Sequence, residues 1–167
     1  ISLNVGSSDI NIKINNCNFR GGGNALVSTD SNDVTVTSSE ILSAGGFILD
    51  AGDEVEFVGN KFDTTSVVDA FIQTNTACNH TISGNYFHHA SSSAGLLNLT
   101  TSTSFISIVT GNTFFNTDVF FTGTHNLTFS SNAVYSAVVT FEDIETLIAS
   151  SNQFDNQASM LLNANAS

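Results

Sequence analysis

Carboxylates fall in three short groups along the chain, each within a stretch rich in turn-forming residues. Two carboxylates that a fold brings together can act as the acid and base of a glycosidase, or can bind calcium through their oxygens. Charged residues in exposed turns more often keep a protein soluble, and we expect that role here. We therefore predict no catalytic residue, no metal site and no cofactor. The groups are Asp30 and Asp33; Asp50, Asp53 and Glu54; and Glu142, Asp143 and Glu145.

The histidines are not spaced like the ligands of a metal. His88 and His89 are adjacent, and such a pair alone does not define a metal site. We expect both of them at the surface. His80 occupies an inward position of a predicted strand, beside Ser107 of the following repeat, which predicts a buried hydrogen bond between the two side chains.

The two cysteines, Cys17 and Cys78, are too few for a disulfide framework. They lie two to three repeats apart at different corners of the predicted fold, too far for a bridge within the chain. A disulfide between two chains through Cys78 stays open.

The overall charge excludes some partners. The formal net charge is −12, and the basic residues are Lys13, Arg20 and Lys61. Such a chain repels phosphate backbones and anionic lipids, so we predict no nucleic-acid partner. No apolar run approaches the roughly 18 residues of a membrane-spanning helix, so we predict no membrane insertion. The length fits one domain over residues 1–167, and the start at Ile1 suggests a processed chain or an excised fragment.

A short motif recurs through the chain. It reads "VTGNTF" at 109–114, with relatives such as "FVGNKF" at 57–62 and "ISGNYF" at 82–87. Aligning the copies gives one position per repeat, at successive intervals of 22, 21, 25, 27, 20 and 20 residues. A period in the twenties is typical of a solenoid. The aligned residues, which we call the ladder positions, are Cys17, Ser39, Asn60, Asn85, Asn112, Asn132 and Asn152.

Each repeat contains three short apolar segments and no helical periodicity. An alternating pair precedes each ladder position, an apolar residue follows two places later, and a third segment such as "FIL" at 47–49 comes after a loop of variable length. Three short strands in 20 to 27 residues predict an all-β, right-handed parallel β-helix of about seven coils. Asparagines at one corner would then hydrogen-bond along the stack as a ladder.

An Asn ladder with inward aromatic columns resembles the right-handed β-helix superfamily that includes pectate lyases and phage tailspikes, over nearly the whole chain. The resemblance implies that the ladder lies between the second and third strands of each coil. For a lyase it would also imply acidic calcium ligands and an Arg or Lys base on the outward face of the first strand. Those positions are expected to be aliphatic or Phe here, and no polygalacturonase-like motif is present, so we expect a non-enzymatic member.

Alternation on the first strand predicts an outward apolar stripe along the solenoid. A continuous exposed apolar patch of this size favours a contact with another copy or another protein, unless a loop of the same chain covers it or the register is shifted by one. The predicted stripe consists of Leu26, Ile48, Phe71, Leu97, Phe120, Val139 and Leu161.

These features favour a structural subunit that assembles into an extracellular filament, spike or surface appendage on a cell or virion. Lateral contact through the stripe would join the copies into an oligomer or polymer. The segments "ISLNV" and "MLLNANAS" both fit a first strand, so end-to-end stacking is a further expectation, although a fragment of a longer β-helix would look the same.

The alternative is a carbohydrate-binding or polysaccharide-degrading module, such as a tailspike segment, and glycan contact stays open. Paired carboxylates or exposed aromatic residues would favour that alternative. Ice binding through outward threonines is disfavoured, because Thr35, Thr81 and Thr128 alternate with Glu56, Ile108 and Ile148.

Overall fold

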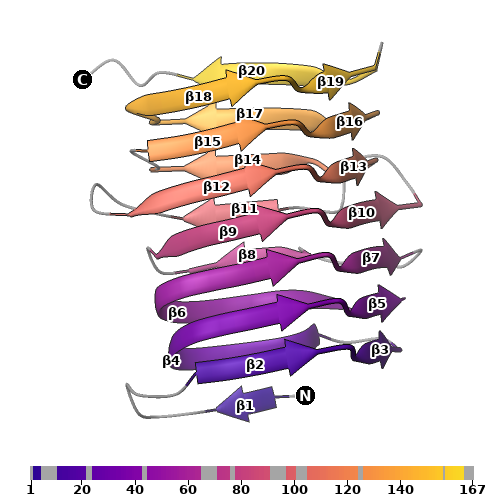
Figure 1. The fold of residues 1–167 in the computed structure, drawn as a ribbon, viewed down its shortest axis with the longest axis vertical. Coiled ribbons are helices and arrows are strands. Elements are labelled where there is room, and N and C mark those ends of the chain that lie inside the picture. The colour runs from indigo at the N-terminus through magenta and orange to yellow at the C-terminus, as the bar shows by residue number, and fades with distance from the viewer. Residues whose placement is uncertain are drawn as a thin grey trace.

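The computed structural model describes residues 2–4, 11–21, 24–42, 45–64, 71–75, 78–90, 97–100, 105–123, 126–155 and 157–163. Within these ranges every regular element is a β-strand, and all pairs of strands are parallel. Figure 1 shows that the front strands run to the right and the rear strands to the left as the chain rises. The chain therefore winds as a right-handed β-helix with three strands per coil, which confirms the predicted fold class.

Three faces make up the solenoid. The first face contains β1 (Ser2–Asn4), the first halves of β4 (Asn24–Thr37) and β6 (Gly45–Val58), β8 (Ile72–Thr74), β11 (Leu97–Thr100), β14 (Val119–Thr122), β17 (Val138–Glu142) and β20 (Ser159–Asn163). The second face contains β2 (Asn11–Asn15), the second halves of β4 and β6, β9 (Asn79–Ser83), β12 (Ile106–Thr110), β15 (Asn126–Ser130) and β18 (Thr146–Ser150). Because β4 and β6 run through the corner between these two faces, the two form one 13-stranded sheet.

The third face is a separate sheet of seven strands, one per coil. It contains β3 (Asn18–Arg20), β5 (Glu40–Leu42), β7 (Lys61–Thr64), β10 (Tyr86–His89), β13 (Thr113–Phe115), β16 (Ala133–Tyr135) and β19 (Gln153–Phe154). Five of these coils have a coil on both sides, and the first and last form the two ends.

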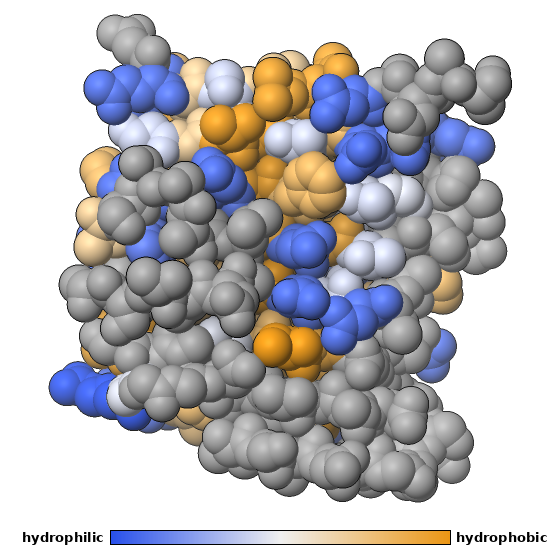
Figure 2. Space-filling model, turned by 180° about the vertical axis from the view of Figure 1, so that it is seen from behind, coloured by the Kyte–Doolittle hydropathy of each residue, from blue (hydrophilic) through white to orange (hydrophobic). Residues whose placement is uncertain are grey.

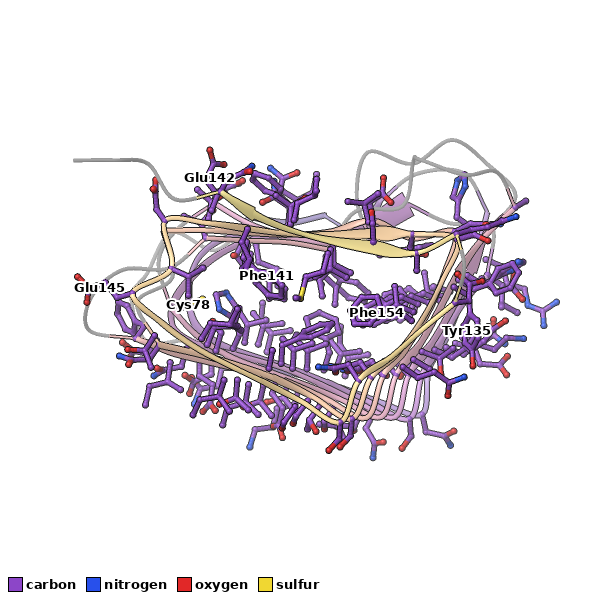
Figure 3. The ribbon with its side chains drawn as sticks, turned by 90° about the horizontal axis from the view of Figure 1, so that it is seen from above. Cys78, Tyr135, Phe141, Glu142, Glu145 and Phe154 are labelled. Atoms are coloured by element: carbon purple, nitrogen blue, oxygen red, sulfur yellow. The ribbon has the colours of Figure 1, made fainter. Side chains whose placement is uncertain are left out.

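Equivalent residues of successive coils lie over one another in the core. Phe87 pairs with Phe62 in the coil before it and with Phe114 in the coil after it. The ring centroids of these neighbours are 4.8 and 5.1 Å apart, and both pairs are stacked. Burying each ring contributes roughly 1.5–3 kcal/mol, and each aromatic pair adds about 0.5–1.5 kcal/mol. Figure 3 shows Phe141 and Phe154 in the same interior, seen along the axis.

The corner between the second and third faces holds the ladder. From Ser39 onward, the side-chain oxygen of each ladder residue accepts a hydrogen bond from the backbone amide of the ladder residue one coil earlier, as Asn112 Oδ1 does from Asn85 N at 2.9 Å. Asn112 Nδ2 also donates to the carbonyl of Ile82 at 2.8 Å. At the N-terminal end Ser39 Oγ takes the same role and accepts from Cys17 N at 3.0 Å. The ladder therefore links all seven predicted positions.

The backbone at this corner explains the recurring motif. The residue before each ladder position has a positive φ in every coil, for example 63° at Gly84 and 67° at Gly111. Glycine adopts this left-handed conformation without steric cost, which is why three copies of the motif read Gly-Asn. The other residues at this place are Asn16, Ser38, Gly59, Ser131 and Ser151.

Candidate functional site

The predicted apolar stripe on the first face is wrong at three of its positions. Phe71, Leu97 and Val139 are fully buried and belong to the core. Phe71 precedes β8, so strand alternation does not govern it, and its ring packs into the third-face column 5.5 Å from Phe62. Leu97 and Val139 lie two residues before Leu99 and Phe141, which point inward in the same strands. Since side chains on one face of a strand recur every second residue, Leu97 and Val139 point inward as well. Leu26 pairs with Phe47 in the strand register, and its side chain falls outside the described part of the structure.

The outward positions of the first face are therefore a mixture of apolar and polar residues. Figure 2 looks onto this face and shows orange and blue residues following one another along the axis. No continuous apolar stripe exists among the described residues, and the predicted lateral contact loses the observation on which it depended. From β6 to β20 the outward column is Ile48, Gln73, Asn98, Phe120, Thr140 and Leu161.

An exposed row of aromatic side chains lies instead on the outer face of the third sheet. We call His88, Phe115 and Tyr135, together with the adjoining Tyr86, the aromatic row. His88 pairs with Phe115 in the next coil, and Phe115 pairs with Tyr135 in the coil after that. Figure 3 shows Tyr135 outside the sheet, whereas Phe154 of the same corner region points inward.

The rings of the aromatic row contact one another in sequence. The centroid distances are 6.2 Å from Tyr86 to His88, 5.3 Å from His88 to Phe115 and 6.2 Å from Phe115 to Tyr135. Tyr86 and Phe115 are 39% and 38% exposed, and Tyr135 is half-buried. The row therefore presents aromatic surface to solvent over three successive coils.

A small charged network continues the row toward the N-terminus. Asp63 lies one coil before His88 in the same column, and its Oδ1 is 2.9 Å from His88 Nδ1. Its other carboxylate oxygen is 3.4 Å from Lys61 Nζ. The hydrogen bond with His88 lowers the pKa of Asp63, against an opposing effect of burial and with a lesser lowering effect of Lys61. Asp63 is therefore an ionised hydrogen-bond acceptor beside the aromatic rings.

The sequence contained a signal for this row that our prediction missed. The residue three places after each ladder position points outward on the third face, and from β3 to β16 this column reads Arg20, Leu42, Asp63, His88, Phe115 and Tyr135. The resemblance to lyases implies functional residues on the first strand and none in this column.

The outer side of the second face is uncharged in its C-terminal half. Strands β9, β12, β15 and β18 contain no Asp, Glu, Lys or Arg. Ile106, Ile108 and Ile148 are exposed there by 53%, 41% and 56%. The strand register places Thr35, Glu56, Thr81, Ile108, Thr128 and Ile148 in one column, so threonines alternate with other residues as the sequence indicates.

A buried polar cluster surrounds His80. Its Nδ1 lies 2.9 Å from Ser107 Oγ, as predicted, and its Nε2 lies 3.1 Å from Thr74 Oγ1 and 3.4 Å from Cys78 Sγ. Burial lowers the pKa of His80 to about 3. Burial, with a smaller effect of Asp53, raises the pKa of the Cys78 thiol to about 12. Both groups are neutral at physiological pH, which suits a structural role.

One open possibility loses its basis, and one prediction about exposure is wrong. Cys78 is fully buried, so it is not placed to form a disulfide between chains; Cys17 is the exposed one. His89 is buried as well, because its position two residues after the inward Phe87 puts it on the core side of β10. Its ring centroid lies 6.4 Å from that of Phe71.

The acidic turns form no metal site in the part of the chain that the structure describes, where no group of three or more His, Cys, Asp and Glu residues lies close together. Asp30 and Asp50 have side chains outside that part. Among the residues described, none belongs to a helix that could cross a membrane.

Comparisons with protein-family models, with curated proteins and with solved structures find no match to this chain. The strand register shows a parallel β-solenoid, and its faces are the features from which a function can be inferred.

Proposed function

We propose that this chain is a rigid carbohydrate-binding module on the surface of a cell or virion, and that the aromatic row is its binding site. The single observation that carries the proposal is the alignment in register of three ring-bearing residues on one outer face, where Phe115 is exposed and His88 and Tyr135 are half-buried. Exposed aromatic residues are the feature that favours a glycan-binding module over a purely structural one.

Aromatic surface exposed to water requires an explanation in this chain, because most of its phenylalanines are core residues. Nine phenylalanines are among the largest fully buried side chains, whereas Phe115 is the one described phenylalanine exposed by more than a third. Both tyrosines of the chain, Tyr86 and Tyr135, belong to the row. Tyrosine combines an apolar ring with a hydroxyl, so it suits ligands that present both C–H and O–H groups.

Polar groups beside the row supply the directional contacts that sugar hydroxyls need. The Asp63 carboxylate accepts hydrogen bonds, and Lys61 and the tyrosine hydroxyls donate them. The strands that carry these residues are paired on both sides, so the site is held in place before any ligand arrives. Preorganisation of this kind lowers the entropic cost of binding.

Replacing Phe115 and Tyr135 with alanine should weaken binding to neutral polysaccharides at least tenfold, because each ring that stacks on a ligand contributes on the order of 1 kcal/mol. Affinity electrophoresis through gels containing individual neutral polysaccharides would measure the retardation. Phe120→Ala is the matched control, since Phe120 is also an outward phenylalanine but lies on the first face. Retardation that is equal in the double variant and the parent would contradict the proposal, as would no retardation of the parent in any gel.

Self-assembly is the second candidate function, and the exposed isoleucines on the second face favour it. Ile106, Ile108 and Ile148 lie on the uncharged half of that face, where two acidic chains can meet without bringing like charges together. This face replaces the first-face stripe as the candidate lateral contact. End-to-end stacking stays a prediction.

If this contact exists, Ile108→Lys combined with Ile148→Lys should shift the sedimentation profile toward monomers, because the added charges would face their own copies across the interface. Thr35→Lys is the control, since it adds a charge in the same column but among charged neighbours. A parent chain that sediments as a monomer at every concentration would exclude the assembly.

A further inference from the structure

We infer that the ligand of the aromatic row is an extended, uncharged glycan chain that lies parallel to the axis of the solenoid, with one sugar residue per coil. This inference depends on the proposed function and adds the orientation and the chemical class of the ligand. It follows from three properties of the row: its direction, its repeat and its charge.

The direction of the row is set by the strand register. Asp63, His88 and Phe115 are paired residues of β7, β10 and β13, and Tyr135 continues the column in β16. Paired residues of neighbouring parallel strands lie above one another along the sheet. The row is therefore a straight track along the axis and does not follow a single strand around the coil.

The repeat of the row is that of the coils. Neighbouring strands are about 4.8 Å apart, and the centroids of successive rings in the column are separated by 5.3 and 6.2 Å. A pyranose ring is similar in size to a benzene ring. In an extended chain of equatorially linked sugars, each residue therefore adds about the length of one such ring. An extended glycan along the track can thus place one sugar against each coil, whereas a glycan lying across the strands would meet one ring only.

Small residues flank the track on one side. Thr113 precedes Phe115 by two residues on the outer face of β13, and Ala133 precedes Tyr135 in the same way on β16. The two large rings therefore extend beyond their neighbours along the strand. Tyr86 occupies the equivalent position beside His88, which makes the row two rings wide in that coil alone.

The charge of the site favours an uncharged ligand. Lys61 is 3.4 Å from Asp63, so the cation nearest the row is already paired with an anion. Over the whole chain the net charge is −12, which repels polyanions such as polyuronides. The carboxylate of Asp63 instead suits the hydroxyl groups of neutral sugars, for which it is a strong acceptor.

A calorimetric titration with oligosaccharide series of one to six residues tests this inference. The probes are cello-oligosaccharides and chito-oligosaccharides as neutral chains and oligogalacturonides as anionic ones. The affinity for a neutral series should rise roughly three- to tenfold with each added residue and level off at three or four residues, because the rings span three coils and Asp63 adds a fourth.

Two variants locate the ligand along the track. Tyr135→Ala removes the last ring, so the rise in affinity should stop one residue earlier than in the parent. Phe120→Ala should leave the whole series unchanged, because this residue lies on another face.

The outcomes separate the inference from the proposed function. Clear binding whose affinity does not depend on chain length would overturn the axial arrangement while the site remains a glycan site. Stronger binding of the oligogalacturonides would overturn the uncharged class. No binding of any series, together with no retardation by polysaccharides, would overturn the proposed function as well.

Discussion

Replacing Asn112 with alanine should lower the free energy of unfolding by about 2–5 kcal/mol, because several buried polar groups lose their partners together. The backbone amide of Asn85 and its side-chain Nδ2 both donate to Asn112 Oδ1, at 2.9 and 3.0 Å. The carbonyl of Ile82 accepts from Asn112 Nδ2 at 2.8 Å. Alanine satisfies none of these groups. Thermal unfolding followed by circular dichroism should show a midpoint lower by roughly 5–15 °C.

Asn112→Ser is the matched control, because the chain itself uses serine at a ladder position. Ser39 Oγ accepts the amide of Cys17 at 3.0 Å, so a serine at 112 can restore the acceptor for Asn85 but not the donor for Ile82. Its melting temperature should lie between those of the parent and the alanine variant. A serine variant no more stable than the alanine one would show that volume, and not hydrogen bonding, governs this corner.

Lowering the pH should destabilise the protein through His80 even at pH values where this residue is still neutral in the folded state. Burial lowers the pKa of His80 from 6.5 to about 3. The unfolded chain therefore binds a proton that the folded chain does not, over the range between these two values. The stability contributed by neutral His80 is complete above about pH 6.5, and it falls as the pH drops toward 3, by at most about 1.4 kcal/mol per pH unit.

The double variant His80→Val, Ser107→Val isolates this effect from the titration of the carboxylates. The same core column has valine at Val34 and Val55, so both substitutions continue an existing pattern and remove the hydrogen-bonded pair together. Melting temperatures measured from pH 7 to pH 4 should fall less in the double variant than in the parent. Parallel curves for the two proteins would show that His80 does not contribute to the acid sensitivity.

The periodic features of the fold were predictable from sequence because each of them is repeated. The ladder residue, the preceding left-handed residue and the inward residue two places later recur in every coil. An ambiguous position in one repeat can therefore be assigned by alignment with the neighbouring repeats. His80 beside Ser107 followed from the same register.

The first face was less predictable, because it follows the loop of variable length and its strands start at different places in the local sequence. Alternation places Ile72 inside correctly, but Phe71 lies before its strand begins, so alternation does not apply to it and it is buried as well. In "LLNL" and "VVTF" several apolar residues occur in a row, and only the later Leu99 and Phe141 settle which of them face inward. The aromatic row was missed for a different reason: each of its members looks unremarkable in its own repeat, and only the vertical alignment shows them together.

The length of the repeat varies from coil to coil, whereas the register of the second-face strands from β9 to β18 stays constant. Successive ladder residues are 20 to 27 positions apart, yet β9, β12, β15 and β18 pair without a shift. The coil is therefore defined by its corners and not by a fixed number of residues. The loop between the third strand of one coil and the first strand of the next can therefore change in length without disturbing the core. During evolution that edge of the rod could diversify while the rest of the architecture is conserved.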